Sequence, residues 1–314
     1  MQQPEISVVI PVYRAEKIVD ELLRQLHAEL QKISPGYEII LVDDRSPDNG
    51  WERMIAGAAN DSRVKCVRLS RNFGQHYALT AGLSYARGKY VVTMDCDLQD
   101  DPAYIQKLYD KIKEGFGIVY TSKARTGHGL FKNIFAGLYF RIYNWLSDSG
   151  NTESDDIGSF LIMQKKVVDA FLSVNDYHRH YLLILKWLGF SSDRIRIEHR
   201  KRFEGKSSYT FTKLVSHALN GITSQSVKLL HLSVSIGFTI FLLSLILGFA
   251  IIVKYFISGY QQGWTSIFVL ILFSTGLMMM SIGVSGIYLG KTFEQSKQRP
   301  LFIVDEEINI SKNE

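Results

Sequence analysis

Cysteine is scarce in this chain: Cys66 and Cys96 are the only two among 314 residues. Two cysteines so far apart predict no disulfide framework, and each is expected to be a small buried thiol. A signal-peptide pattern is also missing, because Glu5 precedes a short apolar run, 6–12, that predicts a strand. The sequence has no internal repeat and no low-complexity segment. A disulfide scaffold and a repeat architecture are therefore excluded.

Charge is missing from two long stretches in the last third of the chain. No charged residue occurs in 232–253 or in 264–290. Each run exceeds the roughly 18 residues that separate a membrane-spanning helix from a buried core helix. We therefore expect two transmembrane helices, at about 232–256 and 264–289, within the segment 231–290.

The cations around these runs predict their orientation. Lys228 lies before the first run, and Lys291, Lys297 and Arg299 lie after the second. Between the two runs there is one cation, Lys254. By the positive-inside rule both termini face the cytoplasm. We expect a multi-pass protein of the inner (cytoplasmic) membrane, with a cytoplasmic catalytic domain at 1–210 and a cytoplasmic tail at 291–314.

Strand and helix patterns alternate over the first part of the chain. Strands are predicted at 6–12, 37–42, 64–69, 90–94 and 117–121, and helices at 16–33, 51–60, 76–86 and 102–114. Short apolar strands separated by helices predict an α/β fold, with a mostly parallel sheet covered on both faces. Such sheets bind ligands at the carboxyl ends of their strands.

Two carboxylates follow the strand at 90–94. Asp95 and Asp97 are at i and i+2, so both side chains lie at the same edge of the sheet. Hard oxygen ligands there suit Mg²⁺ or Mn²⁺, which keep positions open for phosphate oxygens. The local pattern also fits a strand followed by an acidic helix cap, since Asp100 and Pro102 open a helix well.

Other polar residues follow the neighbouring strands. Asp43 and Asp44 begin a turn-rich loop, where they are either caps or partners of a ribose or base. Arg71 follows the third strand and pairs either with a phosphate or with an acidic loop. Because Asp43, Asp44, Asp95 and Asp97 all follow strand ends, we expect them to share one site.

Three further segments have two interpretations each. The aromatic segment 130–147 is either a core helix or a helix in the membrane interface plane, and 211–230 is a candidate juxtamembrane amphipathic helix. The basic loop 196–210 binds either anionic lipid headgroups or a diphosphate. Nucleic acid is a weak third partner, because no known nucleic-acid motif accompanies the charge. Asp156, in an acidic turn, is a cap or faces the substrate.

Taken together, these motifs resemble the family 2 glycosyltransferases of GT-A fold, and more narrowly the polyprenyl-phosphate glycosyltransferases of the bacterial type with two membrane helices. The matching motifs cover nearly the whole chain: Val8-Val9-Ile10-Pro11-Val12-Tyr13, Ile40-Leu41-Val42-Asp43-Asp44-Arg45-Ser46, Arg71-Asn72-Phe73-Gly74-Gln75, Met94-Asp95-Cys96-Asp97-Leu98-Gln99-Asp100, Gly205-Lys206-Ser207-Ser208-Tyr209, and Gly286-Ile287-Tyr288-Leu289-Gly290 with Arg299-Pro300. One motif departs: Ser159 stands where that group usually has aspartate, which is closer to the mannose-synthase pattern.

The resemblance implies a Rossmann-like sheet and inverting transfer of a sugar from a nucleoside diphosphate to polyprenyl (undecaprenyl) phosphate, with UDP-glucose a common donor. It implies a divalent cation, Mg²⁺ or Mn²⁺, on Asp95, Asp97 and Gln99. The other residues implied in donor binding are Pro11, Tyr13, Asp43, Asp44, Arg71, Arg202 and Lys206, and those for the acceptor phosphate are Arg125, Lys132 and Arg141. Asp97, Asp156 and Arg202 are the catalytic candidates. Relatives of this build can be homotetramers.

Two other functions compete with this one. A polysaccharide synthase uses the same fold, but it usually has more membrane helices and a Gln-x-x-Arg-Trp type motif that the sequence lacks. A catalytically silent partner would bind lipid phosphate and recruit a flippase. Such a protein has no reason to keep Asp95, Asp97 and Gln99 together.

Overall fold

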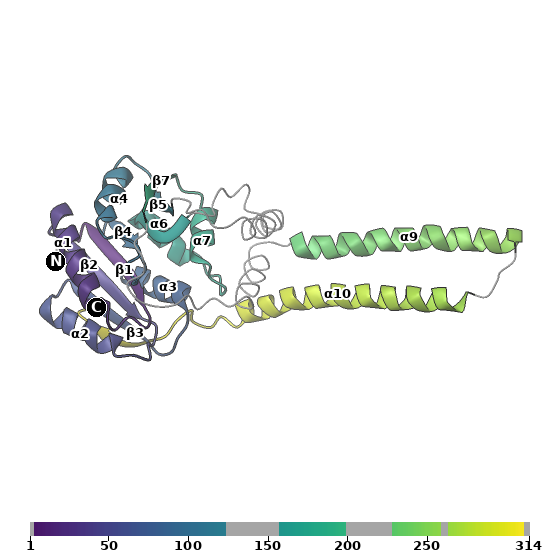
Figure 1. Ribbon diagram of the computed structural model, residues 1–314, viewed down its shortest axis with the longest axis horizontal. Coiled ribbons are helices and arrows are strands. Elements are labelled where there is room, and N and C mark those ends of the chain that lie inside the picture. Colours follow the sequence, from purple (N-terminus) through teal and green to yellow (C-terminus); the bar gives the residue numbers. More distant parts are fainter. Residues whose placement is uncertain (1–2, 124–156, 199–227, 259–262, 311–314) are drawn as a thin grey trace. The chain divides into compact units, whose positions relative to one another are not determined.

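The computed structural model describes residues 3–123, 157–198, 228–258 and 263–310. The chain divides into two compact units. The first comprises 1–128, 152–208 and 299–314, and the second comprises 129–151 and 209–298. Of the described elements, the first unit holds a sheet with its covering helices, and the second holds two long helices (Figure 1).

The first unit is built on an eight-stranded sheet in the order β7-β5-β6-β4-β1-β2-β3-β8. Its strands are β1 Ile6–Val12, β2 Tyr37–Asp43, β3 Val64–Leu69, β4 Tyr90–Thr93, β5 Ile118–Lys123, β6 Ile157–Gln164, β7 Ser192–Ile197 and β8 Val304–Ile308. The neighbours β4, β1, β2 and β3 are parallel to one another, as is the pair β5 and β7. The pairs β4–β6, β5–β6 and β3–β8 are antiparallel. The predicted α/β fold with a mostly parallel sheet is confirmed.

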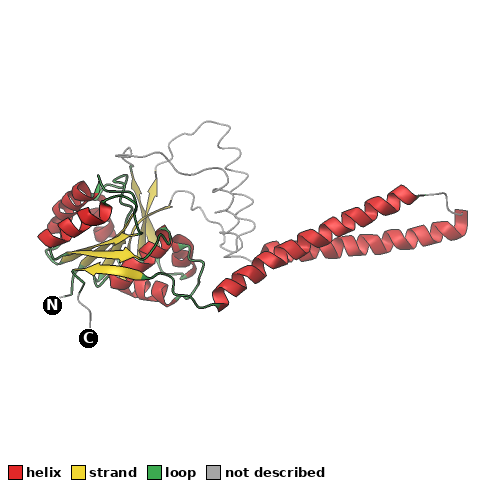
Figure 2. Ribbon diagram, turned by 90° about the horizontal axis from the view of Figure 1, so that it is seen from below, coloured by secondary structure: helices red, strands yellow, loops and turns green. Residues whose placement is uncertain are grey.

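Helices cover both faces of this sheet, in three layers (Figure 2). They are α1 Val19–Ile33, α2 Gly50–Asn60, α3 Gln75–Tyr85, α4 Tyr104–Ile112, α6 Lys165–Ser173 and α7 Tyr181–Trp187. Because side chains alternate along a strand, Val8 and Ile10 of β1 join the core under α1, α2 and α4, while Val9 joins the core under α3, α6 and α7. Every residue of β1 and β2 is buried, as expected for central parallel strands.

Helix α3 lies very close to the central strands. A Cβ at Gly82 would come within 2.4 Å of Val9 Cγ1, so only glycine lets the helix approach β1 this closely. Just before the helix, Gly74 has a φ of +101°, in the left-handed region that glycine adopts without strain. These two glycines bring the first turn of α3 to the carboxyl edge of the sheet.

The strand and helix positions predicted up to residue 123 agree with the structure to within a few residues. The helices α6 and α7 and the strands β6 and β7 were not predicted. The expected acidic turn at 155–160 instead runs into β6 from Ile157, and the expected basic loop 196–210 begins inside β7. The segment 291–314 was predicted as a tail. Instead, β8 from this segment pairs with β3 in the sheet of the first unit. Its sequence, Val-Asp-Glu-Glu-Ile, has three consecutive acids, so it lacks the apolar alternation that marks a strand.

The second unit contains helices α9 Lys228–Ser258 and α10 Trp264–Ser296, which lie side by side (Figure 1). Both occupy the positions predicted for membrane helices. Among the described residues one helical stretch, Phe273–Ser296, is long and apolar enough to cross a membrane. That both helices span the bilayer therefore stays a prediction. The intervening residues 259–262 and the segments 130–147 and 211–230 lie outside the described residues.

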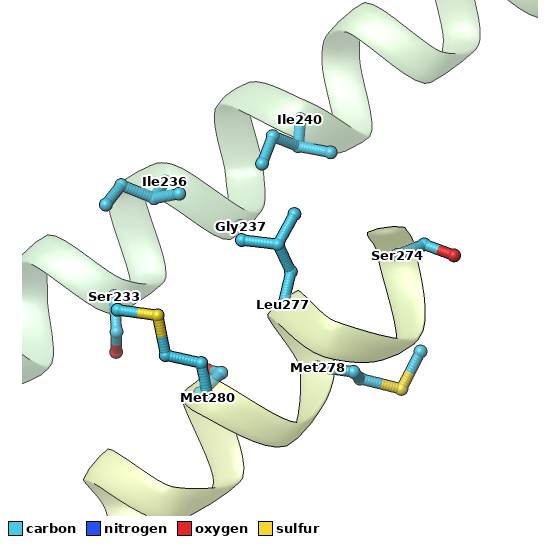
Figure 3. Close-up of a pocket in the computed structure, with 9 residues that line it drawn as sticks. Ser233, Ile236, Gly237, Ile240, Ser274, Leu277, Met278 and Met280 are labelled. Atoms are coloured by element: carbon cyan, nitrogen blue, oxygen red, sulfur yellow. The ribbon is translucent and has the colours of Figure 1, made fainter. Parts of the chain in front are cut away.

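A groove of about 360 Å³ separates part of α9 from α10. Ile236, Gly237 and Ile240 line it from α9, and Leu277 and Met280 line it from α10 (Figure 3). Gly237 leaves space between the two helices, because no atom of α10 lies within 4 Å of the place where its Cβ would be. The helices are therefore not in continuous contact along their length.

Candidate active site

The candidate site lies at the carboxyl edge of β1, β2 and β4, the three central parallel strands. In the registers of these strands Val12 is beside Asp43, and Val9 is beside Thr93. The residues that follow each strand therefore reach the same edge. Asp43 and Asp44, at the end of β2, and Asp95 and Asp97, after β4, lie at the carboxyl ends of two parallel strands separated by β1. That the four residues share one site stays a prediction.

Asp43 is the last residue of β2, and its side chain is fully buried. Its Oδ1 accepts a hydrogen bond of 2.9 Å from the backbone N–H of Ser46, and its Oδ2 is 3.2 Å from Arg68 Nε. Burial raises the pKa of the Asp43 carboxyl, while the Ser46 and Arg68 contacts oppose that shift. The Asp43 carboxylate therefore holds the start of the loop in place.

Asp44 ties two loops together. One of its oxygens accepts from the Phe73 N–H at 2.7 Å, and the other accepts from the Gly74 N–H at 2.8 Å. The residue is 3% exposed, and burial raises the pKa of its carboxyl. The left-handed conformation of Gly74 presents one of these N–H groups. Asp44 thus fixes the approach of α3 to the end of β2.

The rest of the β2 loop is held by short polar contacts. Ser46 Oγ accepts from the Arg14 N–H at 2.6 Å and donates to Asp48 Oδ1 at 2.5 Å. Asp48 Oδ2 accepts from the Glu16 N–H at 3.0 Å. These bonds connect the β2 loop to the loop after β1, which carries Tyr13. The two loops therefore form one structure beside the sheet edge.

The acidic pair after β4 has a more open environment. Asp95 and Asp97 are both half-buried, whereas Asp43 and Asp44 are buried. Asp97 Oδ1 accepts from the Gln99 N–H at 3.1 Å, which closes a short turn after the strand. Leu98 has a φ of 55°, so this turn carries a non-glycine residue in the left-handed region.

Two side chains from distant parts of the chain donate to Asp95. Gln75 Nε2 lies 2.7 Å from Asp95 Oδ1, and Ser159 Oγ lies 2.9 Å from the same oxygen. Gln75 is the first residue of α3, and Ser159 belongs to β6. Both donors are neutral side chains and bind the same oxygen, so they orient the Asp95 carboxylate.

Buried hydroxyl groups fix the position of Ser159. Thr93 Oγ1 donates to the Ser159 carbonyl at 2.7 Å and lies 2.9 Å from the hydroxyl of Tyr181, which is fully buried. Burial raises the pKa of Tyr181, so that hydroxyl keeps its proton. The end of β4, the start of β6 and the start of α7 are thereby joined beside Asp95.

Asp95, Asp97 and Gln99 were predicted as metal ligands. Among the described residues no cluster of three or more His, Cys, Asp or Glu side chains has the arrangement of a metal site. The predicted set contains only two such residues, with an amide as its third member. Two hard oxygen ligands beside an open edge fit a cation that takes its remaining ligands from phosphate and water. The metal assignment therefore stays a proposal.

The other predicted residues in the described part of the chain surround this edge. Pro11 is buried in β1, and the Tyr13 side chain is 43% exposed just after it. Arg71 is exposed, and its guanidinium lies 4.4 Å from the centre of the Phe73 ring. Six further predicted residues lie outside the described residues: Arg125, Lys132, Arg141, Asp156, Arg202 and Lys206.

Sequence reasoning missed the role of Gln75 and the residues around α7. His76 and His180 have ring centres 4.8 Å apart, between the first turn of α3 and the residue before α7. No local pattern links them, because they are brought together only by the packing of α3 against α7. The one sequence signal for this region is Ser159, which departs from the family motif. The motif alone does not predict its contact with Asp95.

Comparison with known proteins gives the family of the chain. The model of the Glycosyl transferase family 2 matches residues 7–172. The chain is 35% identical over 304 residues to an uncharacterized glycosyltransferase of Synechocystis sp., covering 96% of this chain and 95% of that protein. It is 31% identical over 306 residues to the bactoprenol glucosyl transferase of Shigella phage SfV, covering 96% and 99%.

A third relative is the undecaprenyl-phosphate 4-deoxy-4-formamido-L-arabinose transferase of Pseudomonas fluorescens, which is 31% identical over 306 residues, covering 96% of this chain and 89% of that protein. All three similarities extend beyond the family model and include the region of α9 and α10. The site at the sheet edge lies within the matched residues, apart from the strand β8 that flanks it. This chain belongs to the family 2 glycosyltransferases.

Proposed function

We propose that the chain transfers a sugar from a nucleoside diphosphate to polyprenyl phosphate, inverting the anomeric carbon, at the cytoplasmic face of the membrane. The observation that carries the proposal is the difference in exposure along one sheet edge. Asp95 and Asp97 stay half-exposed there, while the neighbouring carboxylates are buried in contacts with the protein. An edge of this kind supports binding of a phosphate-bound cation.

The acceptor is inferred from the relatives and from the helices. Two relatives that match the chain over 96% of its length carry undecaprenyl phosphate or bactoprenol in their names. A lipid acceptor of this class remains in the bilayer, and α10 has a stretch suited to cross it. We infer an inner-membrane enzyme with both helices spanning the membrane and both termini in the cytoplasm.

On the donor side, Asp95, Asp97 and Gln99 would hold Mg²⁺ or Mn²⁺, which neutralises the charge that develops on the leaving diphosphate. Gln75 and Ser159 orient Asp95 through their hydrogen bonds. Arg202 and Lys206 are proposed to add charge-assisted bonds to the diphosphate. The loops that carry Tyr13, Asp43, Asp44 and Arg71 are proposed to receive the nucleoside.

On the acceptor side, the nucleophile is a phosphate monoester. Its second pKa is near 6, so it is largely ionised at pH 7 and needs no general base. It does need cations to hold it beside an anionic donor. Arg125, Lys132 and Arg141 are proposed for this task, with Asp156 orienting the acceptor or the sugar. We propose UDP-glucose as the donor to test first, since one relative is named a glucosyl transferase.

The test is a reconstituted reaction. Purified protein in detergent is incubated with undecaprenyl phosphate, Mg²⁺ or Mn²⁺, and a panel of UDP-, GDP- and dTDP-sugars. The release of nucleoside diphosphate and the mass of the lipid product are followed, with an EDTA control. A glycosyl phospholipid formed from one donor and lost with EDTA is the expected result. Folded protein that turns over no donor but binds polyprenyl phosphate would favour the silent flippase partner.

Two further measurements complete this test. Light scattering of the purified protein checks the homotetramer proposed from the resemblance. Products longer than one sugar would instead indicate a polysaccharide synthase. That function has less support, because the described residues contain two long apolar helices, fewer than the channel-forming synthases usually have.

A further inference from the structure

The strand β8 lies at one edge of the sheet, beside β3, and its pairing with β3 is irregular. Arg68 of β3 is in register with Glu306, but the next residue, Leu69, is in register with Val304. Asp305 therefore has no partner on β3, which makes it a β-bulge. Bulges turn a side chain away from its regular direction, and they are frequent beside active sites.

The side chain of Asp305 reaches the loop between β2 and α2, residues 44–49, which is proposed to receive the nucleoside. Its Oδ2 lies 2.6 Å from Nη1 of Arg45, the residue that follows Asp44. Arg45 has a φ of 54°, a left-handed conformation that costs energy for a residue with a Cβ. The ion pair holds Arg45 at the point where the loop turns away from β2. It therefore stabilises a backbone conformation that the Arg45 residue itself does not favour.

A second acid of β8 acts on the same loop through Arg68. Arg68 Nη1 lies 3.1 Å from Glu306 Oε1, while its Nε lies 3.2 Å from Oδ2 of the buried Asp43. The guanidinium is also 5.3 Å from the centre of the Trp51 ring, at the start of α2. Glu306 thus fixes the cation that balances the charge of Asp43.

The strand does not need these two acids to stay in the sheet. Further along β8, Glu307 accepts from the Tyr85 hydroxyl at 2.5 Å. Asn309 Nδ2 donates to the carbonyls of Ala58 and Val64 at 2.6 and 2.9 Å. These contacts, with the backbone ladder to β3, anchor β8 away from the loop. Asp305 and Glu306 therefore have a role that anchoring alone does not require.

We propose that Asp305 and Glu306 are positioning residues of the donor site, which hold the loop after β2 in its binding conformation through Arg45 and Arg68. The inference rests on the proposed function, because the ligand of this loop is the nucleoside diphosphate of the donor. It assigns a binding task to a segment that follows α10 and lies beyond the residues matched by the family model, 7–172. The donor site is incomplete without this segment.

The experiment measures nucleotide binding by the full-length protein. UDP, GDP and dTDP are titrated with Mn²⁺ by calorimetry, and the one that wild type binds is used for the variants Asp305→Asn and Glu306→Gln. Exposed ion pairs contribute about 0.2–1 kcal/mol, so each variant is expected to bind about 1.4- to 5-fold more weakly, and the double variant about 2- to 25-fold. Glu307→Gln is the matched control: it removes an acid from the same strand, and it is expected to lower thermal stability without weakening binding.

Two readouts separate positioning from simple stabilisation. In transfer assays the donor KM should rise in Asp305→Asn, while kcat and the acceptor KM stay within about 2-fold. The exchanged pair Arg45→Asp with Asp305→Arg should recover most of the lost affinity. Backbone amides of Ser46, Phe73 and Gly74 should exchange with deuterium faster in Asp305→Asn than in Glu307→Gln.

The outcomes are distinct. If wild type binds a nucleotide and both neutral variants bind it equally well, the inference is wrong and the proposed function stands. Affinity that falls equally in Glu307→Gln would also overturn the inference, since anchoring of β8 would then explain it. If wild type binds none of the three nucleotides with Mn²⁺, the proposed function fails, and the inference fails with it.

Discussion

Two strands of one sheet each end in a pair of acidic residues, and the pairs differ in what surrounds them. Asp43 and Asp44, at the end of β2, are 0% and 3% exposed and accept bonds from the protein backbone. Asp95 and Asp97, after β4, are half-buried, and Asp95 accepts hydrogen bonds from the neutral side chains of Gln75 and Ser159. The same residue type near the carboxyl ends of two strands therefore has two different surroundings.

The difference follows from the donors available at each strand end. Around β2 the loops after β2 and β3 supply backbone N–H groups, from Ser46, Phe73 and the left-handed Gly74. Around β4 the neighbours are β1 and the antiparallel β6, which contributes Ser159. Backbone donors make the buried carboxylates part of their loops, whereas Asp95 keeps an exposed fraction and is oriented by side chains from α3 and β6.

The strongest test of this contrast is Asp97→Asn. Losing one carboxylate of the open pair should lower kcat for transfer by about 10²–10³-fold, since preorganised charge at the leaving group is removed. The melting temperature should barely change, because half-buried residues outside the core are usually worth less than about 0.5 kcal/mol. Asp110→Asn, on the exposed face of α4, is the matched control and should retain activity. An active Asp97→Asn enzyme that still requires metal would refute the metal assignment.

Asp44→Asn should give the opposite pattern of effects. An amide has one acceptor for the two N–H groups of Phe73 and Gly74, so one buried donor is left without a partner. We expect the free energy of unfolding to fall by about 1–3 kcal/mol. Denaturant unfolding of the purified protein measures this, with Asp110→Asn again as control. A variant with unchanged stability would show that Asp44 does not hold the loops together.

The pH dependence of the stability difference between wild type and Asp44→Asn tests why the pKa of Asp44 is raised. Burial raises the pKa of Asp44, so the folded protein keeps this proton at pH values where the unfolded chain, with a pKa of about 3.9, has lost it. The stability advantage of wild type over Asp44→Asn should therefore be largest below about pH 4. It should decrease as pH rises through the raised value. An advantage that grows with pH would mean that the two N–H bonds outweigh burial.

A smaller effect is expected from Ser159→Ala. It removes one hydrogen-bond donor to Asp95 but leaves the carboxylate itself. The Mn²⁺ concentration needed for half-maximal activity should rise about 3- to 10-fold, with kcat largely recovered at saturating Mn²⁺. Ser173→Ala, which loses only a bond to the Ala170 carbonyl within α6, is the control. A fall in kcat that Mn²⁺ does not restore would assign Ser159 to the sugar instead.

The first five strands and their shared edge were predictable from the sequence. The difference in exposure between the two acidic pairs was not. Apolar runs gave the first five strands, and parallel topology placed their carboxyl ends together. Whether Asp43 or Asp95 would be open depended on partners 20 to 64 residues away, such as Gln75 and Ser159. Hydrogen bonds over such separations depend on tertiary packing and leave no local pattern.

The strand β8 was missed for a different reason. Its three acids predict a solvated tail when the chain is read alone. They are compatible with a strand because cations already lie opposite them, on Arg45 and Arg68. Charge complementarity between segments about 240 residues apart replaced the apolar alternation on which strand prediction depends.

The smallest effect on activity is expected at Cys96, which lies between Asp95 and Asp97. The prediction of a buried thiol is confirmed for Cys66 and wrong for Cys96, which is half-buried. Burial raises the pKa of Cys96 to about 12, and it raises that of Cys66 to about 12 as well. Since the thiolate is the reactive species, iodoacetamide at pH 8 should modify both at least 100-fold more slowly than it does in urea-unfolded protein. Cys96→Ala should keep activity within about 2-fold, because the thiol is not among the groups proposed to bind the donor, the acceptor or the metal. Fast labelling of Cys96 together with loss of transfer would show that the turn between Asp95 and Asp97 opens in solution, so that the half-exposure of this pair reflects motion rather than a fixed open edge.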